Sequence, residues 1–262
     1  MKKILFSAAI LIAALVFTSC DDPKNGGDYT INAKVSNGDL VNDQVDEVRA
    51  VGGIRVAATP PDWWDDWWGT YYEWQEIVIA EALFKNGGFK LKLPKDIDER
   101  LLEEMFDYFD LDEYELPKGI TISNKNAKGT IVEEIEAYKK NSFVGYFYYF
   151  YGNPNTEAYV MYVFVDSDCK ISGTYSETYT SDWSGTTYKE EYTADLNLKK
   201  GWNAVYSSYT EVGNTDIFKA STKKPNFDLA WYFDGGYGGY YAPEKNVKKH
   251  QKPSMFLRKD RR

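Results

Sequence analysis

Hydrophobic and polar positions alternate along much of this chain, and the alternation predicts β-strands. In "YTINAKVS" (29–36), Ile31, Ala33 and Val35 share one side. The segment 89–93 repeats the pattern, with its phenylalanine and leucines on one side and its lysines on the other. Successive side chains of a strand point to opposite faces, so each segment predicts a strand with one buried face.

Turn signals between such segments predict three hairpins and a final strand at 227–233. The turns are "NGG", "GNPNTE" and "DWSG", which are rich in the residues that tight turns need. The paired segments are 77–84 with 89–93, 143–151 with 158–165, and 170–181 with 186–198. The second hairpin is apolar on both faces, which predicts a central position in a sheet. The third alternates with polar residues, which predicts a more exposed position.

One stretch has the periodicity of a helix. Asp96 is a good N-cap, and Glu99 completes a capping box with it. The apolar residues that follow at helical spacing are Ile97, Leu101, Leu102, Met105, Phe106, Tyr108 and Phe109. The pattern predicts an amphipathic helix that ends near Asp110, before Pro117, and connects two β regions.

Together these elements predict a mainly β protein with two β-sandwich-like regions joined by one amphipathic α-helix. Residues 29–95 resemble the small transthyretin-like or carboxypeptidase-regulatory-like sandwiches of Bacteroidetes lipoproteins, and an immunoglobulin-like arrangement is also compatible with the pattern. The predicted segments are 1–19, a signal peptide; 20–28, a tether; 29–95, a β domain; 96–118, the helical connector; 119–233, a second β domain; and 234–262, a disordered tail.

The first residues predict export and a lipid anchor. Lys2 and Lys3 precede the uncharged run "ILFSAAILIAALVF" (4–17), which is shorter than the ~20 residues that a membrane-spanning helix needs. The run ends in "FTSC", which resembles the lipobox of bacterial lipoproteins. That resemblance implies a lipid on Cys20, which would hold the protein to a membrane; the alternative is a secreted protein with a free Cys20.

Two further resemblances concern location. Asp21 and Asp22 follow the cysteine directly, and this acidic stretch resembles the signal that places Bacteroidetes lipoproteins on the outer face of the outer membrane. The segments "DCKISGTY", "LNLKKGWNAVY" and "LAWYF" resemble the C-terminal half of uncharacterised Bacteroidetes surface lipoproteins. The resemblance implies a compartment and a β fold, and it implies no activity.

The charge of the chain argues against nucleic acid as a partner. The formal net charge is −9, and an acidic body disfavours nucleic acid. The stretch 243–262 is basic, with eight Lys or Arg residues against Glu244 and Asp260. This Gly-rich and then basic tail is either a solvated extension or a contact for phosphate groups or an acidic partner.

Residues for nucleophilic or zinc chemistry are scarce. The single histidine, His250, lies in the tail, and the chain has no His/Cys cluster for zinc. Cys169, without a partner if Cys20 carries lipid, is expected to be a small buried hydrophobe. The sequence therefore predicts no cofactor. Calcium is the remaining metal, with candidate ligands in Asp110–Glu115 and in Asp166–Asp168, which can equally be charged loops.

An aromatic stretch, "PPDWWDDWWGTYYEW" (60–74), holds five of the eight tryptophans. Unpaired carboxylates are costly to bury, and the prolines and Gly69 indicate a loop. The candidate ligand-binding residues are Trp63, Trp64, Asp65, Asp66, Trp67, Trp68, Tyr71 and Tyr72. Exposed aromatic patches mark contact sites for glycans or for other envelope proteins; alternatively, the loop covers its own core.

Three functions remain open on the sequence. The first is a non-enzymatic surface binding or accessory lipoprotein, with a glycan as one candidate ligand. The second is a structural or protein-interaction lipoprotein of the envelope. The third is a glycoside hydrolase that uses two carboxylates, for which Asp65, Asp66 and Glu73 are the candidates.

Overall fold

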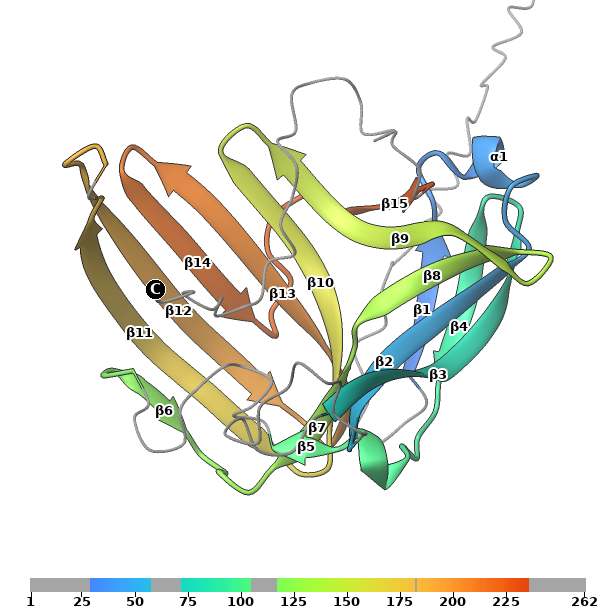
Figure 1. Cartoon of the computed structure of the whole chain (residues 1–262), viewed down its shortest axis with the longest axis horizontal. Coiled ribbons are helices and arrows are strands. Elements are labelled where there is room, and N and C mark those ends of the chain that lie inside the picture. The colour runs from blue at the N-terminus through green and yellow to red at the C-terminus, as the bar shows by residue number, and fades with distance from the viewer. Residues whose placement is uncertain (1–28, 58–71, 105–116, 182, 236–262) are drawn as a thin grey trace, which may run out of the picture.

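The computed structural model describes residues 29–57, 72–104, 117–181 and 183–235 (Figure 1). Strands dominate these residues, which confirms the mainly β class. The elements are β1 (Tyr29–Lys34), α1 (Gly38–Val41), β2 (Glu47–Ala57), β3 (Tyr72–Lys85), β4 (Gly88–Leu93), the 3-10 turn η2 (Glu99–Leu101), β5 (Glu103–Glu104), β6 (Ile120–Ile122), β7 (Lys128–Val132), β8 (Glu134–Lys139), β9 (Ser142–Asn153), β10 (Thr156–Val165), β11 (Cys169–Thr180), β12 (Thr187–Leu198), β13 (Gly201–Val212), β14 (Thr215–Ser221) and β15 (Ala230–Asp234).

The three predicted hairpins are present as β3–β4, β9–β10 and β11–β12. In the first, Asn86 and Gly87 have φ angles of 53° and 71°, the left-handed conformation that the tightest hairpin turns require. A Cβ on Gly88 would lie 2.2 Å from the carbonyl oxygen of Ala33. The glycine therefore allows β4 to approach β1 closely.

Seven strands pair around a closed circuit, in the order β1–β4–β3–β2–β8–β9–β15 (Figure 1, right). A parallel bridge between Val35 and Trp231 closes it, and the Ser36 amide donates to the Trp231 carbonyl at 2.7 Å. Buried side chains of these strands form one core, which includes Ile31, Leu91 and Trp231. This barrel-like closure does not confirm a sandwich of two facing sheets for residues 29–95.

The remaining strands form an open sheet in the order β10–β13–β14–β12–β11–β6 (Figure 1, left). Strands β12 and β14 run parallel, and the other neighbours are antiparallel. One face of this sheet carries a second apolar core, which includes Ile171, Leu196 and Val205. Cys169 belongs to that core with 2% of its surface exposed, so its expected place as a small buried hydrophobe is confirmed.

The strand pairing continues across the boundary predicted near residues 96–118. β2 pairs with β8 across this boundary. The indole N–H of Trp202 in β13 donates to the carbonyl of Pro94 at 2.7 Å. The division of the chain into two β domains remains a prediction, and residues from both share one hydrogen-bonded network.

The predicted helix is wrong over its described part. Only Glu99–Leu101 is helical, as a 3-10 turn, and its cap is Asp98 rather than Asp96, because the Asp98 carboxylate accepts the Arg100 amide at 3.0 Å. Leu102 is extended, and β5 then pairs with β7. Pairing of the main chain with a neighbouring strand has overridden the local helical pattern. Residues 105–110 lie outside the described residues.

Candidate functional site

The two arms of the β11–β12 hairpin carry mirrored motifs, "YSETY" (175–179) and "YKEEY" (188–192). The register places each tyrosine of one arm opposite a tyrosine of the other, and Glu177 opposite Glu190. Side chains two residues apart in a strand share a face. Both motifs therefore present a tyrosine, a glutamate and a second tyrosine on the same side of the sheet.

Strands β14 and β13 extend this pattern with Phe218, Asp216, Tyr209 and Glu211. The outcome is two rows that cross four strands in register: an aromatic row of Tyr175, Tyr192, Phe218 and Tyr209, and an acidic row of Glu177, Glu190, Asp216 and Glu211. These eight residues define the tyrosine–carboxylate face. This face lies on the same side of the sheet as the apolar core around Ile171 and Leu196, further along the same strands.

The aromatic rings stack on one another from strand to strand. Ring centroids are 5.9 Å apart for Tyr175 and Tyr192, 4.9 Å for Tyr192 and Phe218, and 5.2 Å for Phe218 and Tyr209. The corresponding interplanar angles are 29°, 10° and 40°. The first two pairs are stacked, and the third is tilted. All four rings are partly buried.

Hydrogen bonds tie the aromatic row to the acidic row. The hydroxyl of Tyr175 donates to Glu177 at 3.0 Å, and that of Tyr209 donates to Asp216 at 2.8 Å. Tyr192 donates to Glu190 in the same way. Burial raises the pKa of Tyr192 and of Tyr209, and the hydrogen bond and negative charge of the carboxylate raise it further. The carboxylates of Glu177, Glu190 and Asp216 consequently have fixed directions before any ligand arrives.

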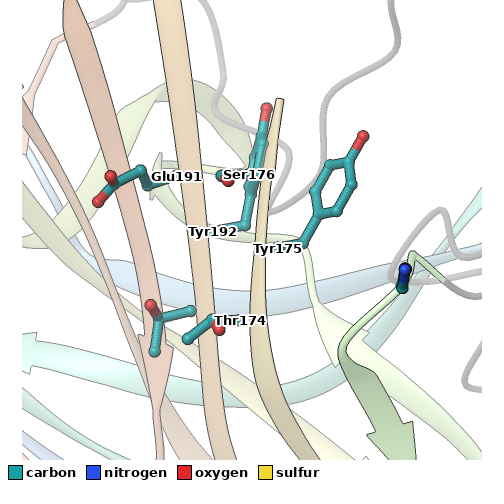
Figure 2. Close-up of a pocket in the computed structure, with 7 residues that line it drawn as sticks. Thr174, Tyr175, Ser176, Glu191 and Tyr192 are labelled. Carbon is teal, nitrogen blue, oxygen red and sulfur yellow. The ribbon is translucent and has the colours of Figure 1, made fainter. Parts of the chain in front are cut away.

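An open pocket of about 530 Å³ lies where β11 and β12 meet the chain just before β6. Figure 2 shows the rings of Tyr175 and Tyr192 on one side of the two strands, with Glu191 directed to the other side. Lys118 adds a positive charge to the lining, and Thr174, Ser176, Glu191 and Thr193 lie on the face of the two strands opposite to the tyrosines. The lining residues are Lys118, Thr174, Tyr175, Ser176, Glu191, Tyr192 and Thr193.

The hairpin turns next to the acidic row carry exposed apolar side chains. Trp183, in the β11–β12 turn, is 100% exposed, and Val212, before the β13–β14 turn, is 58% exposed. The Lys189 amide of β12 donates to the Asn214 carbonyl in the β13–β14 turn, and the Glu211 amide of β13 donates to the Asn155 carbonyl in the β9–β10 turn, both at 2.9 Å. Single exposed apolar side chains are common on protein surfaces, so these two do not by themselves mark a contact site.

The tryptophan-rich candidate site lies almost entirely outside the described residues. This applies to Trp63, Trp64, Asp65, Asp66, Trp67, Trp68 and Tyr71. Tyr72 opens β3, where its main chain pairs with Ala57, and Glu73 is exposed on the same strand. The aromatic stretch thus connects two paired strands, β2 and β3, and its role in binding stays a prediction.

The candidate calcium ligands fall into two groups. Asp110–Glu115 lies outside the described residues. Asp166 accepts the Lys128 amide at 3.0 Å, and Asp168 accepts the Lys199 ammonium and the Lys200 amide, both at 2.9 Å. The hydrogen bonds from Lys199 and Lys200 lower the pKa of Asp168. Both carboxylates hold the β10–β11 turn in place, and within the described ranges no cluster of three or more His, Cys, Asp or Glu residues is arranged to hold a metal.

A second group of charged residues lies on the outside of the barrel-like circuit. Glu136 is only 5% exposed, and Tyr138 donates a hydrogen bond of 2.8 Å to it. The Arg49 guanidinium lies 4.0 Å above the Tyr138 ring. Burial raises the pKa of Glu136, the Tyr138 hydrogen bond opposes this rise, and the charges of Glu76 and Glu134 add to it. Arg49 also pairs with Glu47 and Glu81, as in a structural ion network.

No protein-family model, curated protein or solved structure matches this chain. Among the described residues, no helix has the length and apolar character needed to cross a bilayer.

Sequence reasoning recognised the hairpin but missed the face that it builds. The available signal was the mirrored Tyr-x-Glu-x-Tyr motif, which an antiparallel register converts into facing pairs. The segment "TDIFKAS" (215–221), which forms β14, has no comparable motif in the sequence, and the sequence analysis does not predict it as a strand. Its parallel pairing with β12 depends on tertiary structure.

Proposed function

We propose that this chain is a lipid-anchored cell-surface binding protein and that it has no catalytic activity. The tyrosine–carboxylate face is proposed as its ligand-binding surface in the described part of the chain. One observation carries this proposal: four aromatic rings and four carboxylates lie in register across four strands, and three hydroxyl–carboxylate hydrogen bonds orient them.

Physical reasons favour recognition over catalysis at this face. Stacked rings and fixed acceptors lose little conformational entropy when a ligand binds, so they favour affinity. The tyrosine hydroxyl protons are already donated to carboxylates, so the face offers mainly acceptors. Ligands that suit it carry donors, such as sugar hydroxyls or the cationic groups of a protein.

The proposed location rests on the sequence alone. "FTSC" supports lipidation of Cys20, and the acids at 21 and 22 support display on the outer face of the outer membrane. Labelling of growing cells with a radioactive fatty acid tests this. Label should be incorporated by the parent and lost in Cys20→Ser, and protease added to intact cells should degrade the parent. Absence of label in both forms would remove the anchor from the proposal.

Binding is tested with the protein and a matched pair of variants. Glu177→Gln/Glu190→Gln neutralises two acids of the face, whereas Asp195→Asn neutralises one on the opposite side of β12, where it pairs with Lys223 at 2.9 Å. A glycan array and a pull-down from envelope extracts provide the ligands. We expect a ligand that the parent and Asp195→Asn retain and the double variant loses. Equal retention by all three forms would contradict the assignment of this face.

The tryptophan-rich stretch is tested on the same array. Glycan binding that is lost when Trp63, Trp64, Trp67 and Trp68 become Ala, and kept in the Glu177→Gln/Glu190→Gln form, would place a glycan site there. A search for glycosidase products with Asp65→Asn, Asp66→Asn and Glu73→Gln addresses the enzymatic alternative. Product release by the parent would contradict a purely binding function.

A further inference from the structure

The tyrosine–carboxylate face concentrates negative charge in one line across the sheet. Glu177 lies opposite Glu190, Glu190 lies opposite Asp216, and Asp216 lies opposite Glu211. Like charges directly opposite each other on a sheet repel. The acidic row therefore attracts a run of positive charge that can lie across several strands at once.

The lysines of the same strands stand on the opposite side of the sheet. Lys189 and Lys219 each follow a residue of the tyrosine–carboxylate face in the sequence, and neighbouring residues of a strand point to opposite faces. On that opposite side, Lys189 pairs with Glu191. The acidic group around Glu136 differs, because it contains a cation of its own, Arg49. A run of positive charge is thus drawn to the acidic row rather than to Glu136.

One stretch of this chain supplies such a run. Residues 243–262 contain eight Lys or Arg residues against two acidic ones, a net charge of +6. The other long stretches outside the described residues have no such excess. Residues 1–28 have three basic against three acidic residues, and 58–71 and 105–116 together have eight acidic residues and no Lys or Arg. Charge complementarity thus selects the C-terminal segment.

The C-terminal segment is long enough to reach the acidic row. It leaves the described structure beyond β15, where Asp234 pairs with Tyr146 of β9. From Tyr146 to Asn153, β9 extends roughly 23 Å, and the turn that follows is bonded to Glu211. From Glu211 to Glu177 the row crosses three strand spacings, roughly 15 Å. The 28 residues after Asp234 span up to about 90 Å when extended, which is more than twice this path.

We propose that the basic segment 243–262 lies along the acidic row of the tyrosine–carboxylate face in the same molecule, and that an external ligand of this face must displace it. The ammonium and guanidinium groups of the segment donate to carboxylates that tyrosine hydroxyls already orient. The contact is electrostatic, so salt weakens it. The second part of this inference rests on the proposed function, because it names how binding at that same face is regulated.

Cross-linking of the full-length protein with a carbodiimide tests the contact, because this reagent joins a carboxylate directly to an amine that touches it. The yield of links between the segment and the row should fall about threefold in Glu177→Gln/Glu190→Gln. It should also fall in about 1 M salt and stay unchanged in Asp195→Asn. Mass spectrometry of the cross-linked monomer should find Asp216 and Glu211 joined to lysines of the segment, which are Lys245, Lys248, Lys249, Lys252 and Lys259.

Three results would overturn the contact. If no lysine of the segment were linked to the row, the segment would be a solvated extension. Links mainly to Glu76 or Glu134 would place it on the barrel-like circuit instead. Links to the row that form only between molecules would assign the row to the segment of a second copy.

Competition is measured with a fluorescein-labelled peptide of the sequence 243–262, added to the full-length protein. The tail variant replaces four lysines of the segment by Gln, and its control replaces four exposed lysines of the folded body. We expect the peptide to bind the tail variant about tenfold more tightly than the parent or the control, because a tethered segment competes at an effective concentration of ~1 mM. Equal affinity for all three forms would overturn occupation within one molecule. The replaced residues are Lys245, Lys248, Lys249 and Lys252 in the tail variant, and Lys85, Lys90, Lys200 and Lys224 in the control.

The two proposals fail separately, because cross-linking needs no external ligand. Absence of links, while an envelope ligand is still lost in Glu177→Gln/Glu190→Gln, would remove this inference and leave the binding face. Links to the row in a protein whose double variant keeps every ligand found by array and pull-down would show the reverse: the segment occupies the face, and the proposed binding function is wrong. A ligand of the face that binds the tail variant no more tightly than the parent would overturn the displacement.

Discussion

The ring of Tyr192 lies 4.9 Å from that of Phe218 and is nearly parallel to it, at 10°. The two residues face each other across the parallel pairing of β12 and β14. The hydroxyl of the same tyrosine donates to Glu190. Tyr192 is thus the residue that joins the aromatic row to the acidic row.

Substitution of Tyr192 separates these two roles. Tyr192→Phe keeps the ring stack and loses the hydrogen bond, which should lower the free energy of unfolding by about 1 kcal/mol. Tyr192→Ala loses both, with an expected cost of about 3 kcal/mol. Urea denaturation followed by tryptophan fluorescence measures both values. Equal costs for the two variants would show that the stacking contributes nothing beyond the hydroxyl group.

Alkaline pH should destabilise the tyrosine–carboxylate face. The folded-state pKa of Tyr192 and of Tyr209 lies above the ordinary value of 10.0. Their contribution is therefore complete below pH 10 and is lost as the pH rises toward the folded-state pKa, because the unfolded chain gives up these protons first. Stability measured between pH 9 and pH 11.5 should fall less steeply in Tyr192→Phe/Tyr209→Phe. If stability fell with pH at the same rate in the parent and the variant, these two tyrosines would not be the source of the pH dependence.

Gly173 and Gly185 should differ sharply in how well they tolerate replacement by alanine. Gly173 has φ 138°, and a Cβ there would lie 1.9 Å from the carbonyl oxygen of Gly119. Gly173→Ala should cost about 3 kcal/mol or more and disturb the β6–β11 pairing, because the backbone must move. Gly185 has φ 64° with nothing within 4 Å of the added Cβ, so Gly185→Ala should cost about 1 kcal/mol. Thermal unfolding of both variants checks the order.

Cys169 should react only when the protein opens. Its side chain is 2% exposed, and burial raises the pKa of its thiol. In Cys20→Ser it is the one remaining cysteine of the chain. Ellman's reagent should modify the native protein about a hundredfold more slowly than the urea-unfolded protein. Fast modification under native conditions would show that the core beneath β11 opens readily.

Local patterns were sufficient for the hairpins. The turn at Asn86–Gly87 requires positive φ angles, and this requirement is written in the residue types themselves. Alternation similarly located β1 and the three predicted hairpins, because a strand with one buried face leaves a period of two in the sequence. The helix prediction failed because a local pattern was not sufficient there. Residues 96–104 have the apolar spacing of a helix, but the pairing of β5 with the distant strand β7 competes with helix formation.

The sequence by itself determined that this chain is mainly β, where most of its hairpins turn, and that Tyr-x-Glu-x-Tyr occurs in both arms of one hairpin. These features depend on contacts between residues near each other in the chain. The tertiary structure alone decided that Phe218 and Asp216 join these motifs, and that Val35 meets Trp231 to close the barrel-like circuit. Both depend on pairings between strands that are distant in the sequence. No local period encodes such pairings, because burial and hydrogen bonding of the whole sheet select them.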